Sequence, residues 1–262
     1  MVEANLIGFS TSAEGDSFTA GYNPTSAETL PGKFPGATDG EINRAVDLAT
    51  SAFAVYSKIS GTKKAAFLNA ISDEIMNLGD ELVQRCCAES GLPEARIIGE
   101  RGRTMGQLQM FANLVGEGSW LEATIDVAQP DRTPVPKPDI RRMLVPMGPV
   151  AVFAASNFPL AFSTAGGDTA STLAGGNPVI VKAHGAHPGS SALVGSAIVK
   201  AAQKTGLPDG VFSLLHGAGS TVGQALIKHE GIKAAGFTGS QTAGRILYDI
   251  ANQRRNPIPF FA

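Results

Sequence analysis

The sequence has few cysteines, little net charge and no long apolar run, and each of these shortages excludes a class of protein. Only two of its 262 residues are cysteines, and these are the neighbours Cys86 and Cys87. Vicinal cysteines rarely close a disulfide, because the bond would strain the peptide between them. We therefore expect a fold that is not stabilised by disulfides.

The charge is nearly balanced, with a formal net charge of -2. Such a chain has no basic surface to attract nucleic acid or an anionic membrane. The most apolar stretches, such as residues 146–162, are interrupted by Gly, Pro and Asn, so none reaches the roughly 20 residues that span a bilayer. The first residues also lack the basic segment and apolar core of a secretory signal. We expect a cytoplasmic protein with small-molecule partners, no nucleic acid and no membrane.

The four histidines do not predict a metal site. His184 and His187 lie close together, but neither they nor His216 and His229 are accompanied by a cysteine or carboxylate at the spacing of metal ligands. We therefore expect no bound metal.

What is present is enough apolar material, 43% of the residues, for a sizeable core. Residues 1–36 carry many turn signals and are expected to form an extended arm that crosses a surface. Residues 38–57 have apolar side chains at helical spacing, with Asp39 as the expected N-cap. The same periodicity predicts further helices at residues 62–78, 80–90 and 94–115.

Residues 120–127 and 140–145 look like two strands joined by AQPDRTPVPKPD, a segment too rich in proline for a central sheet. They predict a projecting hairpin. Because a long two-stranded ribbon is marginal by itself, one interpretation is that it buries a face against another subunit. The other interpretation is a hairpin that folds back on its own chain, and the pattern alone does not decide between them.

After Met147, short β-rich runs alternate with helical stretches that begin near Pro159, Pro188, Gly219 and Ser240. The runs occupy residues 150–155, 178–182, 211–215, 234–238 and 258–261. Right-handed crossovers between them predict an α/β fold with a doubly wound, parallel, five-stranded, Rossmann-like sheet in the order 3-2-1-4-5. Ligands bind such a sheet where the order reverses, between the first and fourth strands.

The loop after the first of these strands reads SNFP and contains Asn157. An amide held at the carboxyl end of a buried strand offers a rigid N–H donor to an oxygen that gains negative charge during a reaction. An asparagine that only caps the following helix would give the same pattern.

The loops after the third and fourth strands are rich in glycine. FTGSQTAG, residues 237–244, places Gly239 in a tight turn and Ser240 at a helix N-terminus, where free N–H groups and a hydroxyl can hold a phosphate. Ordinary strand-to-helix turns often look similar. HGAGSTVG, residues 216–223, would let a nucleotide approach the backbone or would simply form a tight turn.

The second strand ends in Lys182, followed by AHGAH. In dinucleotide-binding folds this strand end commonly presents an acidic residue, which contacts the ribose 2′-hydroxyl and repels a 2′-phosphate. Here lysine, glycine and nearby imidazoles leave room and positive potential for that phosphate. This predicts NADP as the cofactor, with NAD as second choice. The alternative is that Lys182 only extends from the strand end toward solvent.

Four motifs occur in order, namely SNFP, GNPVIVK, GLPDGVFSLLHGAG and FTGSQTAG. Together they resemble the aldehyde dehydrogenase superfamily. More narrowly, AASNFPLAFSTAGGDTASTLAGGNPVIVKAH resembles bacterial NADP-linked members that oxidise 2-oxoglutarate semialdehyde, also called 2,5-dioxovalerate. The resemblance covers nearly all of this chain but only the first half of a family member.

The resemblance implies a division into three parts. Residues 1–118 would be the arm and helical region of the cofactor domain, 119–146 an oligomerisation hairpin and 147–262 the dinucleotide-binding sheet. The catalytic domain would be absent. In the complete protein the hairpin would join subunits into a dimer or tetramer.

Roles for single residues also follow from the resemblance. Asn157 would help to hold the thiohemiacetal oxyanion, and Lys182 would bind the adenosine ribose or its phosphate. Glycines 219 and 223 would flank the adenine, and the turn at 239 and 240 would hold the pyrophosphate. At Gly185 many NAD-using members carry a glutamate, so its absence also favours NADP. The full set expected to contact cofactor is Phe153, Ala154, Lys182, His184, Gly185, Gly219, Gly223, Phe237, Thr238, Gly239 and Ser240.

In the family a cysteine thiolate attacks the aldehyde, hydride passes to the nicotinamide, and a glutamate activates water. The cysteine and the glutamate both follow the fifth strand. We therefore expect nucleophile and base to lie beyond this chain, and this segment alone to be inactive. Cys86 and Cys87 are not substitutes, because helix cysteines are usually inert packing. Two alternatives stay open: a nucleotide-binding or assembly module without turnover, and an acylating relative that uses phosphate or coenzyme A as acceptor.

Overall fold

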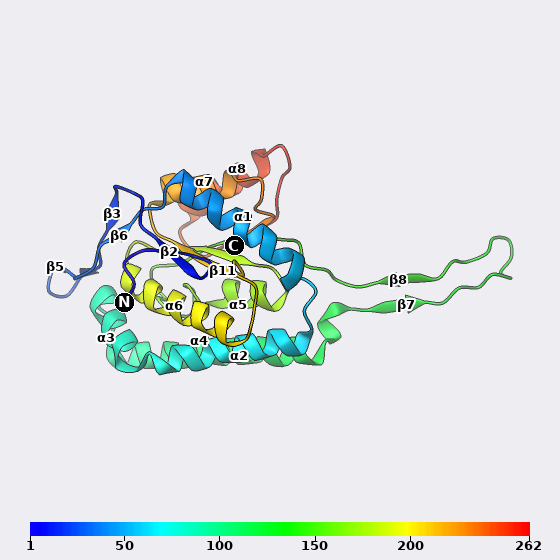
Figure 1. Ribbon diagram of the computed structural model, residues 1–262, viewed down its shortest axis with the longest axis horizontal. Coiled ribbons are helices and arrows are strands. Elements are labelled where there is room, and N and C mark those ends of the chain that lie inside the picture. Colours follow the sequence, from blue (N-terminus) through cyan, green and yellow to red (C-terminus); the bar gives the residue numbers. More distant parts are fainter.

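A central sheet lies between two layers of helices in the computed structural model, which describes residues 1–262 (Figure 1). The strand order is β13-β12-β9-β10-β11-β1-β2. The parallel strands are β9 (Val150–Phe153), β10 (Val179–Lys182), β11 (Phe212–Leu215), β12 (Ala234–Phe237) and β13 (Phe260–Phe261). The predicted order 3-2-1-4-5 is confirmed, and it reverses between β9 and β12.

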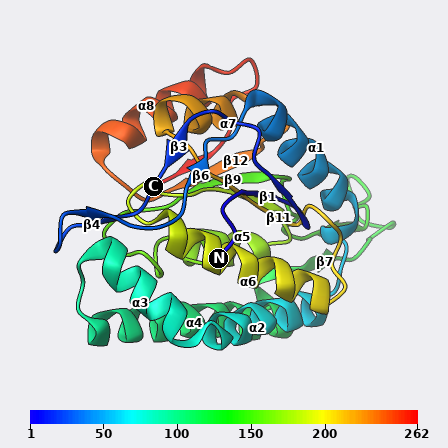
Figure 2. The same ribbon diagram turned by 60° about the vertical axis from the view of Figure 1, so that its left-hand side comes forward.

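The first four parallel strands are buried along their whole length. Such strands carry continuous apolar runs, because helices cover both faces of a parallel sheet. On one face lie α1 (Asp39–Tyr56), α7 (Gln224–Lys228) and α8 (Gln241–Gln253). On the other lie α5 (Gly167–Ala174) and α6 (Pro188–Lys204), with α2 (Gly61–Asn77), α3 (Gly79–Ser90) and α4 (Glu94–Glu117) outside them (Figure 2). No helix combines the length and apolarity that a membrane crossing requires.

Part of the N-terminal arm belongs to the sheet, although the sequence pattern predicts no strand there. Strand β1 (Asn5–Ile7) pairs antiparallel with β11, and β2 (Ser10–Ser12) continues the edge, so the sheet has seven strands and not five. Strands of three residues are too short for a periodic pattern to identify. The rest of the arm forms two small ladders, β3 (Phe18–Thr19) with β6 (Phe34–Pro35) and β4 (Tyr22–Asn23) with β5 (Glu28–Thr29).

One predicted helix start, near Pro159, and the predicted N-cap of α1 are wrong. Residues 156–166 form successive turns, and α5 begins only at Gly167, not near Pro159. Helix α1 is capped by Thr38 and not by Asp39. Thr38 Oγ1 accepts a hydrogen bond from the Glu41 N–H (3.2 Å), and Glu41 Oε2 accepts one from the Thr38 N–H (2.8 Å). This reciprocal capping box needs a glutamate three residues after the cap, which only Thr38 has.

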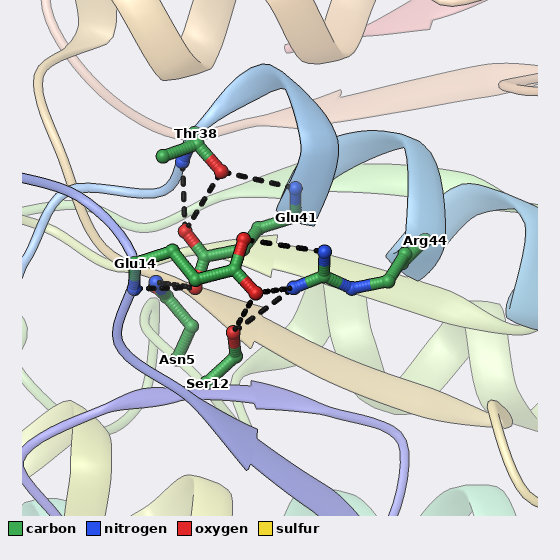
Figure 3. A network of polar contacts seen from close by, with 6 residues as sticks. All are labelled: Asn5, Ser12, Glu14, Thr38, Glu41 and Arg44. Carbon is green, nitrogen blue, oxygen red and sulfur yellow. Dashed lines mark hydrogen bonds and ion pairs between the residues drawn. The ribbon is translucent and has the colours of Figure 1, made fainter.

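The carboxylate of Glu41 is buried and joins α1 to the arm (Figure 3). Its Oε1 accepts hydrogen bonds from Asn5 Nδ2 (3.2 Å) and from the Glu14 N–H (3.3 Å). Asn5 Oδ1 in turn accepts one from the His216 N–H (2.8 Å). At the rim Arg44 pairs with Glu14 at 2.7 Å. Glu41 therefore fastens the arm, α1 and the loop after β11 to one another.

Replacing this carboxylate by an amide, Glu41→Gln, should cost about 2 kcal/mol of unfolding free energy near neutral pH, because one oxygen acceptor is lost from a buried network. Burial alone raises the pKa of Glu41, but the hydrogen bonds to its carboxylate bring it below the ordinary 4.5. A carboxyl with a lowered native pKa stabilises the fold above its unfolded pKa and loses that contribution as pH falls through the native pKa. Urea unfolding at about pH 7 and about pH 3 should therefore show the difference from wild type shrinking in acid. An equal difference at both values would contradict this assignment.

The predicted hairpin projects from the body as a two-stranded ribbon of β7 (Thr124–Asp126) and β8 (Ile140–Arg142) (Figure 1). It does not fold back on its own chain, so that interpretation is wrong. Trp120 lies before the ribbon, in the short 3₁₀ helix η1 (Ser119–Leu121), and not in a strand. Apolar side chains on the ribbon are open to solvent, with Ile125 65% and Ile140 50% exposed.

Candidate functional site

A crevice with a volume of about 620 Å³ opens at the carboxyl ends of β9 and β12, where the strand order reverses. Four loops contribute its lining: Phe153, Ala154, Ala155, Ser156, Asn157, Lys182, His184, Gly219, Phe237, Thr238, Gly239, Ser240, Ala243 and Leu247. The turns carrying Asn157 and Ser240 thus share one pocket, as the sequence analysis expected. Of the residues predicted to act in the site, only Gly185 and Gly223 do not line it.

Those two glycines lie just outside the crevice. Gly185 is in an exposed turn with space beside it, since a Cβ there would meet only Thr19 Cγ2, at 3.8 Å. Gly223 is buried, and a Cβ there would lie 3.3 Å from the Phe153 ring. It ends η2 (Gly219–Gly223), a short π-helical turn that takes the place of the helix start predicted at Gly219. Gly223 therefore lets this turn pack closely against a crevice side chain.

Asn157 does not cap the following helix, because α5 begins at Gly167 with Gly166 at the N-cap. This removes the alternative that the sequence left open. The Asn157 side chain is exposed and lines the crevice. Its loop is closed at the base by the Ala155 N–H, which donates to the Phe162 carbonyl at 2.8 Å.

On the opposite wall, Ser240 is the N-cap of α8, and its Oγ accepts from the Ala243 N–H at 3.3 Å. The unpaired N–H groups of this first turn carry the positive end of the helix dipole, which favours an anion. Glycine suits position 239 in the preceding turn, because a Cβ would come within 2.7 Å of the Phe237 ring and would displace it.

Lys182 ends β10 at the crevice and is only 8% exposed. Burial lowers the pKa of this ammonium to about 8. Burial also lowers the pKa of His184 to about 4, with smaller contributions from His187 and Lys182, and that of His216 to about 4. The imidazoles are therefore neutral near pH 7, so the expected positive potential comes from Lys182 and α8 and not from the histidines.

Three polar side chains hold the crevice loops, of which His187 and Glu100 are buried and Asp168 is half-buried. None of these roles was predicted from the sequence. His187 Nε2 lies 2.7 Å from the Ala155 carbonyl oxygen. Asp168 Oδ2 accepts from Thr238 Oγ1 at 3.2 Å. Glu100, on α4, accepts from two backbone N–H groups of the loop that carries Asn157. The helical periodicity of the sequence could have indicated this role for Glu100, because Glu100 lies on the buried stripe of α4.

The two cysteines lie on α3 and do not line the crevice. Cys86 is fully buried, and burial raises the pKa of its thiol to about 12 despite a hydrogen bond to Ser190 Oγ. Burial also raises the pKa of Cys87. A thiol with a raised pKa is a poor nucleophile at neutral pH, which agrees with the expectation that neither cysteine is catalytic.

The sheet order and the crevice at its reversal point define a doubly wound α/β protein, the class that binds ligands at this position. The profile described as "Aldehyde dehydrogenase family" matches residues 10–259, and the chain belongs to this family. The resemblance found in the sequence motifs is thereby confirmed.

Two curated relatives bear the same enzyme name. "Alpha-ketoglutaric semialdehyde dehydrogenase 2" of Azospirillum brasilense is 53% identical over 258 residues, covering 98% of this chain and 49% of the relative. "Alpha-ketoglutaric semialdehyde dehydrogenase" of Acinetobacter baylyi is 45% identical over 240 residues, covering 92% of this chain and 45% of the relative. The chain therefore spans about half the length of the curated relatives it matches.

A solved structure has the same fold. The crystal structure of an NAD-dependent benzaldehyde dehydrogenase from Corynebacterium glutamicum superimposes with a TM-score of 0.84 at 23% sequence identity. The superposition covers 98% of this chain and 52% of that one.

Proposed function

We propose that this chain is the cofactor-binding part of an aldehyde dehydrogenase that oxidises 2-oxoglutarate semialdehyde to the carboxylic acid, with hydride transfer to NADP. The observation that carries the proposal is the crevice that joins Asn157, Lys182 and the turn at Ser240 in a chain of this family. The substrate is proposed because two relatives at 53% and 45% identity are named for it.

Each wall of the crevice has a proposed task. The turn at Gly239 and Ser240 holds the pyrophosphate of the dinucleotide at the positive end of α8. Lys182 pairs with the phosphorylated ribose, and Gly219 and Gly223 leave room for the adenine. NADP, when bound, supplies the hydride acceptor. The amide of Asn157 donates a hydrogen bond to the oxygen of the attacked aldehyde, which gains negative charge in the transition state.

No cysteine or glutamate lines the crevice. We therefore propose that the thiolate that attacks the aldehyde and the base that activates water come from outside these 262 residues. The parts proposed for the chain remain the arm and helical region at 1–118, the hairpin at 119–146 and the sheet at 147–262.

The preference for NADP over NAD has two supports in the structure. Lys182 is the one ammonium among the crevice residues. Gly185, three residues after it, places no carboxylate there that would repel a 2′-phosphate. The neutral imidazoles are not needed for this preference.

The hairpin is proposed to join copies of the chain into a dimer or tetramer. A projecting ribbon with apolar side chains 50% to 65% exposed gains stability when a partner covers it. Sedimentation of the intact gene product and of a variant without residues 124–142, which removes both strands and the segment between them, would detect this assembly.

The function is tested by titrating the intact gene product with NADP and NAD and by following NADPH formation with 2-oxoglutarate semialdehyde. We expect NADP to bind at least about tenfold more tightly than NAD, and the semialdehyde to be oxidised without any other acceptor. Absence of binding to either dinucleotide would overturn the proposal. NADP binding without turnover would favour a non-catalytic module, and turnover that requires phosphate or coenzyme A would favour an acylating enzyme.

A further inference from the structure

The loop that carries Asn157 is held by α4, which lies on the far side of α5 from the sheet (Figure 2). We call residues 155–162 the Asn157 loop. Its two ends are joined by the hydrogen bond from the Ala155 N–H to the Phe162 carbonyl (2.8 Å). No helix or ladder orders the residues between these ends, so the direction of the Asn157 amide depends on what the loop contacts.

Glu100 makes the central contact with this loop. Its Oε1 accepts hydrogen bonds from the Leu160 N–H at 2.8 Å and the Ala161 N–H at 3.0 Å. Glu100 is only 3% exposed, and Arg96 Nη2 lies 3.6 Å from its other oxygen. A buried carboxylate is costly to desolvate, and an apolar residue would suit this helix position better if packing were its only task. The residue type therefore points to the two backbone N–H groups that it accepts from.

Aromatic contacts from the same helix add to this attachment. The Arg96 guanidinium lies 4.6 Å from the ring centre of Phe158, and that of Arg103 lies 5.0 Å from the ring centre of Phe162. The two rings pack edge to face with centres 5.2 Å apart. Cations over ring faces favour one placement of the rings, so α4 fixes the residue next to Asn157 as well as the backbone beyond it.

We propose that Glu100 is a positioning residue for aldehyde oxidation: by accepting from Leu160 and Ala161 it sets the Asn157 loop so that the Asn157 amide points at the developing oxyanion. The inference rests on the proposed function. Glu100 does not line the crevice, so it acts only through the loop. A donor stabilises a transition state only when it is already aimed at the charge, and this alignment has to be supplied by residues behind it.

The experiment compares Glu100→Ala with Glu100→Gln in the intact gene product. Alanine leaves both loop N–H groups without an acceptor, and we expect kcat to fall about tenfold while the Kd for NADP changes by less than about twofold, since misplacement of a catalytic group costs rate and the dinucleotide contacts lie elsewhere. Glutamine keeps an oxygen in place of Oε1 and should restore most of kcat. If the alanine variant does not fold, Glu100→Asp, one methylene short of the loop, gives the same comparison.

A matched control and a double variant separate positioning from general destabilisation. Ser72→Ala removes the hydrogen bond from Gln109 Nε2 (3.2 Å) that ties α4 to α2, without touching the Asn157 loop, and should leave kcat unchanged. In an Asn157→Ala background, Glu100→Ala should cause little further loss of kcat, because residues that act as a unit are not additive. A full additional loss there, or an unchanged kcat in Glu100→Ala alone, would overturn the inference. An unchanged kcat in Asn157→Ala alone would instead overturn the proposed function.

Discussion

Asn157→Ala should lower the kcat of the intact gene product about 100- to 1000-fold, which is the usual cost of removing one donor to a developing oxyanion. The amide is in the loop that follows β9, it lines the crevice, and its residue is exposed. Because the residue is exposed, truncating it should leave the melting temperature close to the wild-type value. Since the donor interacts with charge that exists only during reaction, the Kd for NADP should also stay unchanged.

The measurement is single-turnover NADPH formation at saturating dinucleotide and aldehyde, with dinucleotide affinity measured separately. Ser156→Ala is the matched control, because Ser156 is the exposed neighbour in the same loop and also lines the crevice. We expect it to keep most of the wild-type rate. A fall in kcat for the serine variant as large as that for Asn157→Ala would show that the loop and not the amide is responsible.

Some residues of this site can be predicted from local sequence patterns, and others depend on contacts that exist only in the folded chain. Asn157 and Ser240 were placed correctly, because glycine, proline and β-rich runs mark the strand ends, and handedness then fixes which ends are neighbours. Strand β1 was missed because it has three residues and depends on β11, far away in the chain. The charge of His184 was misjudged because its burial, which lowers its pKa, is a property of the folded state.

The helical periodicity of α4 indicates that Glu100 is buried, although it does not identify its partners. Ile97, Thr104 and Leu108 are buried on one stripe of α4, and Glu100 lies on that stripe. A charged residue at such a position needs a partner, but the sequence cannot say which one. Here the partners are the backbone N–H groups of Leu160 and Ala161, which follow Glu100 in the chain by 60 and 61 residues.

Replacing the crevice ammonium in Lys182→Met should weaken NADP binding about 10- to 100-fold, the expected loss of a hydrogen bond to a charged group. NAD, which lacks the 2′-phosphate, should lose less. In wild type the Kd for NADP should be lowest near pH 7 and should rise as pH passes through about 8, where Lys182 loses its proton. Fluorescence titration across this range would detect both effects. A pH-independent Kd for NADP would contradict the assignment of Lys182.

Gly185→Glu is the complementary variant. The exposed turn has room for a side chain, since a Cβ would meet only Thr19 Cγ2. The added carboxylate should repel a 2′-phosphate, so that NADP binds more weakly while NAD binding is kept. If NADP and NAD lost affinity equally in Lys182→Met and in Gly185→Glu, the crevice would not distinguish the two dinucleotides by the 2′-phosphate. NADP would then have no advantage over NAD.

Lys182→Met should weaken NADP binding but increase the stability of the fold. Because burial depresses the pKa of Lys182 from 10.5 to about 8, the unfolded chain binds the proton more tightly, and the charged form opposes folding below about pH 8. Lys182→Met should therefore raise the unfolding free energy of the ligand-free protein by about 3 kcal/mol at neutral pH. The gain should disappear as pH rises from about 8 toward 10.5, where both states lose the charge. If Lys182 is a buried cation that serves to bind the ligand, the methionine variant should be more stable and should bind NADP more weakly. If Lys182 only extends toward solvent, neither the unfolding free energy nor the Kd for NADP should change.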